Sequence, residues 1–152
     1  MWGGWAGGFF VWFVPFAVSC LVIKPDENGN MVRLLDEETF HTLMLFCGSS
    51  ASAFAIYKCF PTTLKAGMWL GFQFLLINWF LDLLVLVPLM AQEAIGQEKL
   101  TFGAWTATVP HWFRKIGAGY VGFVLICPAA GAIAEQAAAT AVSARDKNTK
   151  IH

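Results

Sequence analysis

The chain has 152 residues, of which 57% are hydrophobic and only 13% charged, and its ten basic and ten acidic side chains cancel. Soluble domains are about 45–50% apolar and about 25% charged, so this composition excludes an ordinary soluble globule. It also excludes a disordered chain, which needs low hydrophobicity and a high net charge. The zero net charge argues against nucleic acid as a partner, because there is no basic field to attract it. An integral membrane protein remains.

Four runs of the sequence are almost free of charge: residues 1–23, 42–57, 66–92 and 116–134. A bilayer core about 30 Å thick needs about 20 apolar residues in a helix, and a backbone in lipid satisfies its own hydrogen bonds only as a helix or a closed barrel. The runs predict an all-α membrane protein of one domain, with four transmembrane helices in an antiparallel bundle. The helices are expected near residues 5–23, 40–60, 66–90 and 114–135.

The first run has a second interpretation, a cleaved signal peptide. Such a peptide needs a positively charged start and a small-residue cleavage site. Residues 1–5 carry no positive charge, and the stretch from Ile23 to Asp26 is a poor cleavage site. A retained helix is favoured. If the protein is imported into an organelle, its targeting segment is missing from this numbering.

The connections extend these helices beyond the membrane core. Three acids from Asp36 to Glu38 suit the first turn of a helix over 36–60, where they complement the positive end of the helix dipole. Pro61 follows, and Thr62 or Thr63 can cap a third helix over 62–90.

The longest connection, residues 91–109, suits an interfacial segment lying on the membrane between the third and fourth helices. Thr108-Val109-Pro110 is typical of a helix start, because proline is favoured in the first turn. We therefore predict a fourth helix over 110–142, followed by a solvated tail over 143–152.

The orientation of the helices is left open by the positive-inside rule. Each side of the predicted topology carries five Lys or Arg residues, so the counts tie. The acids gather on the side opposite both termini, which favours termini on the cytoplasmic, stromal or matrix side.

Asp82 is the single acid deep inside a predicted span, and Asn78 lies one turn earlier on the same face. An acid at that depth costs about 2.5–3.5 kcal/mol on insertion scales, and such residues often have a function. One interpretation is a proton- or cation-binding site in a transport path, with Asn78 and the second-helix serines Ser49 and Ser52. The other is helix packing, with Asp82 and Asn78 bonded to a neighbouring helix. Packing is favoured because Asp82 has no companion acid.

The string from Asn78 to Pro88, N-W-F-L-D-L-L-V-L-V-P, resembles the third helix of a group of uncharacterised small four-helix integral membrane proteins that carry N-W-x-x-D-x-x-V-L-V-P. Phe102-Gly103-Ala104-Trp105 and the glycines after Ile116 are similar to the loop and last helix of that group. The resemblance covers residues 66–125. It implies four helices and marks Asn78 and Asp82 as features of the group, and it implies no activity.

Pairs of small residues four apart predict close helix packing. Gly48 with Ser52 and Ala51 with Ala55 form such pairs on the second helix, and Ala118 with Gly122 does so on the fourth.

His41 and His111 lie at the ends of predicted spans, where a histidine can be an exposed residue, a lipid contact or an axial ligand of a chlorophyll or haem. The interface interpretation is favoured, because ligation needs a shaped pocket and a second shell. Trp112 fits an interfacial aromatic belt, and Trp79 faces protein or a large apolar ligand. Peripheral contacts to chlorophyll, carotenoid or lipid are therefore the cofactor expectation.

Catalytic and metal motifs are absent from the sequence. The four cysteines have no Cys-x-x-Cys spacing, and His-Glu-x-x-His and Gly-x-Ser-x-Gly do not occur. The sequence predicts no enzyme and no resident metal.

Three functions follow as hypotheses, and one of them, a pigment- or lipid-binding module that uses His41 or His111, can coexist with the favoured one. The favoured one is an accessory, non-catalytic structural subunit of a large energy-converting membrane complex, photosynthetic or respiratory, with lipids and other integral membrane subunits as partners. The alternative is a small oligomeric transporter or channel that uses Asp82 with Asn78. The expected location is the thylakoid, the mitochondrial inner membrane or a bacterial inner membrane.

Overall fold

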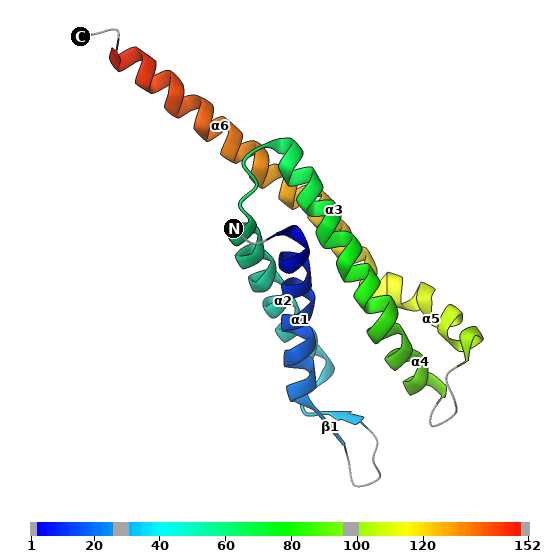
Figure 1. The fold of residues 1–152 in the computed structure, drawn as a ribbon. Coiled ribbons are helices and arrows are strands. Elements are labelled where there is room, and N and C mark those ends of the chain that lie inside the picture. The colour runs from blue at the N-terminus through cyan, green and yellow to red at the C-terminus, as the bar shows by residue number, and fades with distance from the viewer. Residues whose placement is uncertain (1–2, 26–30, 96–100, 150–152) are drawn as a thin grey trace. The chain divides into compact units, whose positions relative to one another are not determined.

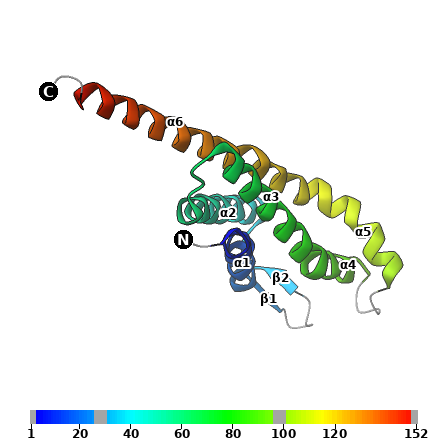
Figure 2. The ribbon, with the colours of Figure 1, turned by 45° about the horizontal axis from the view of Figure 1, so that its top comes forward.

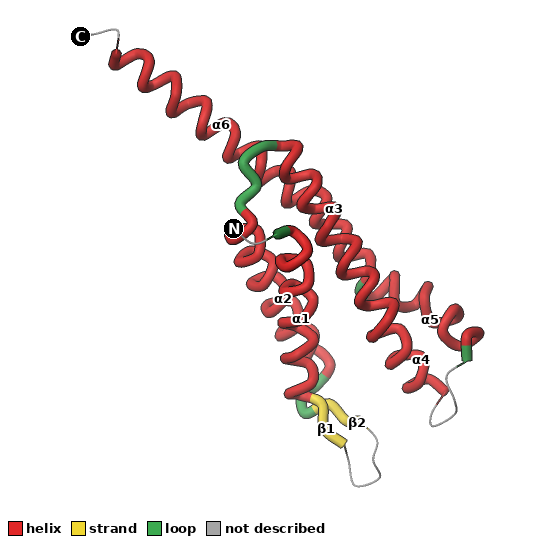
Figure 3. The backbone as a smooth tube through the Cα atoms, in the orientation of Figure 1, coloured by secondary structure: helices red, strands yellow, loops and turns green. Residues whose placement is uncertain are grey.

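The computed structural model describes residues 3–25, 31–95 and 101–149, and these residues are almost entirely helical (Figure 1, Figure 3). Four of the described helical segments are long and apolar enough to cross a membrane: Gly4–Val22, Glu37–Cys59, Leu64–Ala91 and Gly119–Arg145. The chain is therefore a multi-pass integral membrane protein. It divides into two compact units, residues 1–59 and 60–152, where the sequence predicted one domain.

The first unit is a helical hairpin. Helix α1 (Gly4–Val22) is followed by a short antiparallel strand pair, β1 (Ile23–Pro25) and β2 (Met31–Arg33), and by helix α2 (Glu37–Cys59). Lys24 pairs with Val32 in the strand pair. These strands depart from the all-helical expectation and are visible as the yellow segment in Figure 3.

Helices α1 and α2 make an antiparallel contact through aromatic, proline and small residues. The rings of Phe10 and Phe54 are 5.5 Å apart, and Pro15 faces Gly48. Ala51 and Ala55 are buried in the same contact. A Cβ atom added to Gly48 would lie 3.8 Å from the Pro15 ring, an ordinary van der Waals distance.

The start of α2 is capped as its acidic sequence suggests. Asp36 accepts hydrogen bonds from the backbone N–H of Thr39 at 2.9 Å and from its hydroxyl at 2.6 Å. These bonds favour the ionised form, so the pKa of Asp36 is lowered from its ordinary value.

The described part of the second unit holds four α-helices, a π-helix and a 3₁₀ segment, and the first α-helix, the π-helix and the second α-helix form one continuous span. In chain order its elements are α3 (Leu64–Leu81), the π-helix η1 (Asp82–Leu86), α4 (Val87–Ile95), α5 (Phe102–Lys115), the 3₁₀ segment η2 (Gly117–Gly122) and α6 (Phe123–Thr149). The cap predicted at Thr63 is confirmed, because its hydroxyl oxygen accepts from the Ala66 N–H at 3.1 Å.

The segment predicted as one helix over 110–142 is two helices. Thr101, rather than Thr108, caps the first of them by accepting from Ala104 N–H, so the helix start predicted at Pro110 is wrong. Pro110 lies inside α5, and the glycine-rich stretch Gly117–Gly122 then interrupts the α-helix. The second helix, α6, continues to Thr149 through the predicted tail.

Helices α3 and α6 lie side by side (Figure 1, Figure 2), and three glycines bring their backbones into contact. Gly67 faces the backbone of Cys127 and Pro128, Gly71 faces the Phe123 carbonyl, and Gly131 faces the Thr63 carbonyl. The pairs run in opposite directions along the two helices, so α3 and α6 are antiparallel. A Cβ atom at any of the three glycines would approach a carbonyl oxygen to less than 3.0 Å, which real Cβ atoms essentially never do.

Candidate functional site

The third span changes its helical register at Asp82. The N–H of Val87 donates to the carbonyl of Asp82, five residues earlier, which is the π-helical pattern. Pro88 follows directly, and in a regular α-helix its ring would clash with the carbonyl four residues before it. Because a π-turn widens the helix by one residue, it accommodates this proline within a continuous span.

The extra residue also decides which side chains are buried. Along α3 the buried positions Gly67, Gly71, Phe74, Asn78 and Asp82 recur at α-helical spacing. After Asp82 the next buried residue comes five positions later, at Val87, followed by Ala91. Leu89, which would continue the stripe in a regular α-helix, is 51% exposed. The π-turn therefore keeps Asp82 and Val87 on one buried face.

The register change leaves the backbone carbonyl of Leu83 without a backbone donor, and a tryptophan of α5 supplies one. The α-helical donor to the Leu83 carbonyl would be Val87 N–H, which bonds Asp82 instead. The π-helical donor would be residue 88, a proline without an N–H. The indole N–H of Trp105 donates to this carbonyl at 3.1 Å. A carbonyl buried in a membrane span is costly without such a donor.

A second tryptophan of α5 binds the carboxylate itself. The Nε1–H of Trp112 donates to Asp82 Oδ2 at 2.9 Å, and the hydroxyl of Tyr120, in η2, also hydrogen-bonds to this carboxylate. Asp82 is completely buried, and Trp112 is 3% exposed. We call Trp105 and Trp112, with their acceptors on Leu83 and Asp82, the indole clamp.

The clamp fixes how α5 faces the span. Trp105 and Trp112 are seven residues apart, so they lie within about 20° of each other around the helix axis. The residues between them on that face, Thr108 and Val109, are half-buried. The two indole hydrogen bonds form together at one rotation of α5 about its axis, so they fix which face of α5 meets the span.

Asn78, predicted beside Asp82, lies in the same buried stripe. Its side-chain N–H donates to the Phe74 carbonyl of its own helix at 2.8 Å. The predicted serine partners belong to the first unit, where Ser49 is exposed and the Ser52 hydroxyl donates to the Gly48 carbonyl at 2.6 Å.

The residues predicted to contact pigment or lipid have different surroundings. His41 is exposed and lies 3.6 Å from Glu37, one turn earlier on α2. His111 is exposed on α5, and Trp79 packs edge-on against Phe113 with ring centroids 5.8 Å apart. Trp112 differs from its prediction as an interfacial contact, because the buried Asp82 carboxylate needs a donor and Trp112 supplies it.

The predicted packing pair on the fourth helix differs from the one observed. Gly122 lies in η2, and a Cβ atom there would meet only Ile126 of the following turn, at 3.9 Å. The side chain of Ala118 lies outside the described part. Close packing is instead made by Gly67, Gly71 and Gly131, where the backbones of α3 and α6 meet.

Several residues of this site and of the α3–α6 contact were not predicted from the sequence. The motif Gly67-x-x-x-Gly71 is a small-residue packing motif that is recognisable in the sequence. The seven-residue spacing of Trp105 and Trp112 was also visible, whereas Tyr120 and the bond from Leu64 N–H to Glu135 Oε2 at 3.0 Å depend on the tertiary fold.

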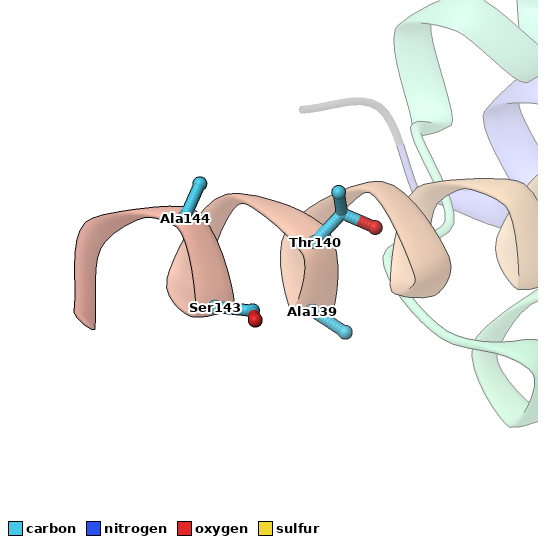
Figure 4. A pocket seen from close by; sticks show the side chains of 4 residues that line it. All are labelled: Ala139, Thr140, Ser143 and Ala144. Atoms are coloured by element: carbon cyan, nitrogen blue, oxygen red, sulfur yellow. The ribbon is translucent and has the colours of Figure 1, made fainter. Parts of the chain in front are cut away.

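The described residues hold no group of three or more His, Cys, Asp or Glu side chains placed to bind a metal ion. One surface hollow lies on α6 beyond Glu135 and is lined by the small side chains of Ala139, Thr140, Ser143 and Ala144 (Figure 4). A second hollow on α1 is lined by Ala6, Phe9, Phe10 and Phe13. Asp82 lines neither hollow.

Comparison with known proteins gives no family for this chain: no protein-family model matches it, and neither a curated protein nor a solved structure matches it significantly.

Proposed function

We propose that this chain is an accessory, non-catalytic structural subunit of a large energy-converting membrane complex, photosynthetic or respiratory. The observation that carries the proposal is the indole clamp. Its acid is completely buried and is hydrogen-bonded by Trp112 and Tyr120 of its own chain, an arrangement that holds helices together.

The outward surfaces of the spans support a role among other membrane components. At most 33% of the residues in any span window are buried within the chain. The remaining surface is rich in exposed aromatic residues, among them Phe9, Phe13, Trp69, Phe72 and Phe80. Lipids, pigments and other integral membrane subunits are the partners that this surface suits.

An antiparallel four-helix bundle is part of the same proposal. Each helix pair is antiparallel, which agrees with an antiparallel four-helix bundle in the membrane. The resemblance of residues 66–125 to the small four-helix membrane proteins described above is part of it too. The membranes proposed are the thylakoid, the mitochondrial inner membrane and the bacterial inner membrane.

The test is the native size of the particle that contains the chain. Native membranes are solubilised gently, and the chain is followed through size exclusion and identified with its companions by mass spectrometry. We expect the chain in a particle with several other membrane subunits. A stable monomer or homo-oligomer in gentle detergent would contradict the proposal.

A transporter or channel is the second candidate, and one observation favours it. Asp82 is a buried intramembrane acid at the first residue of a π-helix, and both features are frequent at functional sites. Proton or cation flux in liposomes separates the two functions. Transport predicts that Asp82→Asn abolishes the flux and that Glu38→Gln, which changes an exposed acid, does not. Equal flux in wild type and Asp82→Asn removes this candidate.

A further inference from the structure

The face of α5 opposite the indole clamp, which we call the outer face, carries the positive charge of Arg114. The clamp keeps this face directed away from the span. Counting about 100° per residue, Arg114 is nine residues from Trp105 and so lies about 180° around the helix from the clamp. Arg114 and His111 are both exposed. Rotating α5 to bury Arg114 would break the two indole hydrogen bonds at once.

No acid neutralises this charge from nearby in the sequence. Residues 101–134 contain Arg114 and Lys115 and no Asp or Glu at all. The acid that α5 binds, Asp82, is buried against Trp112 on the opposite side of the helix.

An apolar flank runs beside the basic face. Phe102 and Phe113 are eleven residues apart, so they lie within about 20° of each other around α5. They are 80% and 41% exposed. Helix α5 therefore has an inner face held by the clamp, an apolar flank and a basic outer face.

This arrangement occurs between two membrane spans, Leu64–Ala91 and Gly119–Arg145, where the chain leaves and re-enters the bilayer. Interfacial helices place aromatic side chains at the acyl boundary and cations among the headgroups. We propose that the outer face of α5 binds the phosphate of an anionic glycerophospholipid headgroup, with Arg114 as its main ligand and His111 beside it. The inference is independent of the proposed subunit role.

The experiment counts lipids bound to the full-length chain by native mass spectrometry in detergent. Phosphatidylglycerol is the probe, phosphatidylcholine is the zwitterionic comparison, and inorganic phosphate is the competitor. One surface cation contributes a few-fold to binding an anionic membrane, so Arg114→Gln is expected to weaken phosphatidylglycerol binding about fivefold. Arg114→Lys should retain most of the binding, because lysine still offers a point charge.

The matched control is Lys65→Gln, which removes one exposed cation from the first turn of α3. It should leave the affinity unchanged, and an equal loss in both variants would overturn the site in favour of diffuse charge attraction. Displacement of the lipid by inorganic phosphate at matched concentration would assign the face to a soluble anion and overturn the lipid.

A second variant guards against misfolding of Arg114→Gln. His111→Glu places an acid one turn from Arg114 on the exposed face, so the new carboxylate competes for the guanidinium and should also weaken phosphatidylglycerol binding. Unchanged binding in His111→Glu and Arg114→Gln, each with wild-type circular dichroism, would disprove the proposal.

Discussion

The two helix pairs, α1 with α2 and α3 with α6, both cross back antiparallel, yet they are built differently. In the first pair, the Phe10 ring contacts the Phe54 ring, and a Cβ atom at Gly48 would have room beside Pro15. In the second, glycines let backbone touch backbone, and a buried acid lies further along the same face. The first pair has room for a Cβ atom at Gly48, whereas the second depends on the absence of a Cβ atom at three positions and on hydrogen bonds at one.

The difference shows where a membrane protein can use a polar group. The α1–α2 pair keeps one α-helical register along its contact, even at Pro15 inside α1. The span that carries Asp82 is irregular, because Pro88 removes a donor and the π-turn shifts the others. The indole donors of α5 act where the regular hydrogen bonds are lost.

The largest effect is expected from filling the α3–α6 contact. In Gly67→Ala and Gly71→Ala the new methyl group meets a carbonyl oxygen of α6, so each should lower the unfolding free energy by about 1–3 kcal/mol. Gly48→Ala in the first pair and Gly122→Ala in η2 have room and should change it by less than about 0.5 kcal/mol. Unfolding by dodecyl sulfate in mixed micelles measures all four. Equal losses at Gly67 and Gly48 would erase the distinction between the pairs.

The second effect concerns the carboxylate. Trp112→Phe keeps the apolar ring and removes the donor to Asp82, so it should cost about 1–3 kcal/mol. Removing both partners, in Trp112→Phe with Asp82→Leu, should recover part of that loss, because no buried acceptor is then left without its donor. The same unfolding titration checks the cycle. A double variant as unstable as the sum of the single variants would mean that the bond contributes nothing of its own.

The regular part of this structure was predictable from the sequence, and the irregular part was not. Charge-free runs placed α1, α2 and the third span near their observed bounds, because the bilayer selects for length and apolarity. The depth of Asp82 singled it out as the residue to examine. Its partners could not be predicted, since Trp112 and Tyr120 reach it only through the fold of α5 and η2.

The division of the predicted fourth helix has a local cause that the sequence contained. Pro110 looked like a helix start because proline is favoured there, yet a helix can also carry an interior proline, at a cost of about 3 kcal/mol, where other contacts hold the helix. Thr101 already caps α5 nine residues earlier, and the clamp holds the helix on both sides of Pro110. The glycines at 117, 119 and 122 mark the true interruption.

A smaller effect tests why Trp105 is needed. Trp105→Phe should cost about 0.5–1.5 kcal/mol by removing the donor to the Leu83 carbonyl. In a Pro88→Ala background, residue 88 gains an N–H that can bond a carbonyl of the preceding turn, so the cost of Trp105→Phe should fall. A double-variant cycle on the unfolding free energy measures the coupling. Additive costs would show that the proline is not the reason for the indole donor.

The smallest effect is a pH-dependent loss of amide protection at the start of α2, which is absent at the start of α3. The Asp36 cap requires the carboxylate, and its pKa is lowered in the folded state, so its contribution is present above the unfolded pKa and disappears as the pH falls through the folded pKa. The Thr63 hydroxyl has no such titration, so the Ala66 amide on α3 serves as an internal reference. Amide exchange followed by NMR should show the Thr39 amide losing protection at acidic pH while the Ala66 amide keeps its own. In Asp36→Ser the hydroxyl caps α2 at every pH, and the acid-dependent loss at Thr39 should vanish. If it persists in Asp36→Ser, the acid sensitivity arises from Glu37 or Glu38 in the first turn, and the cap is not its source.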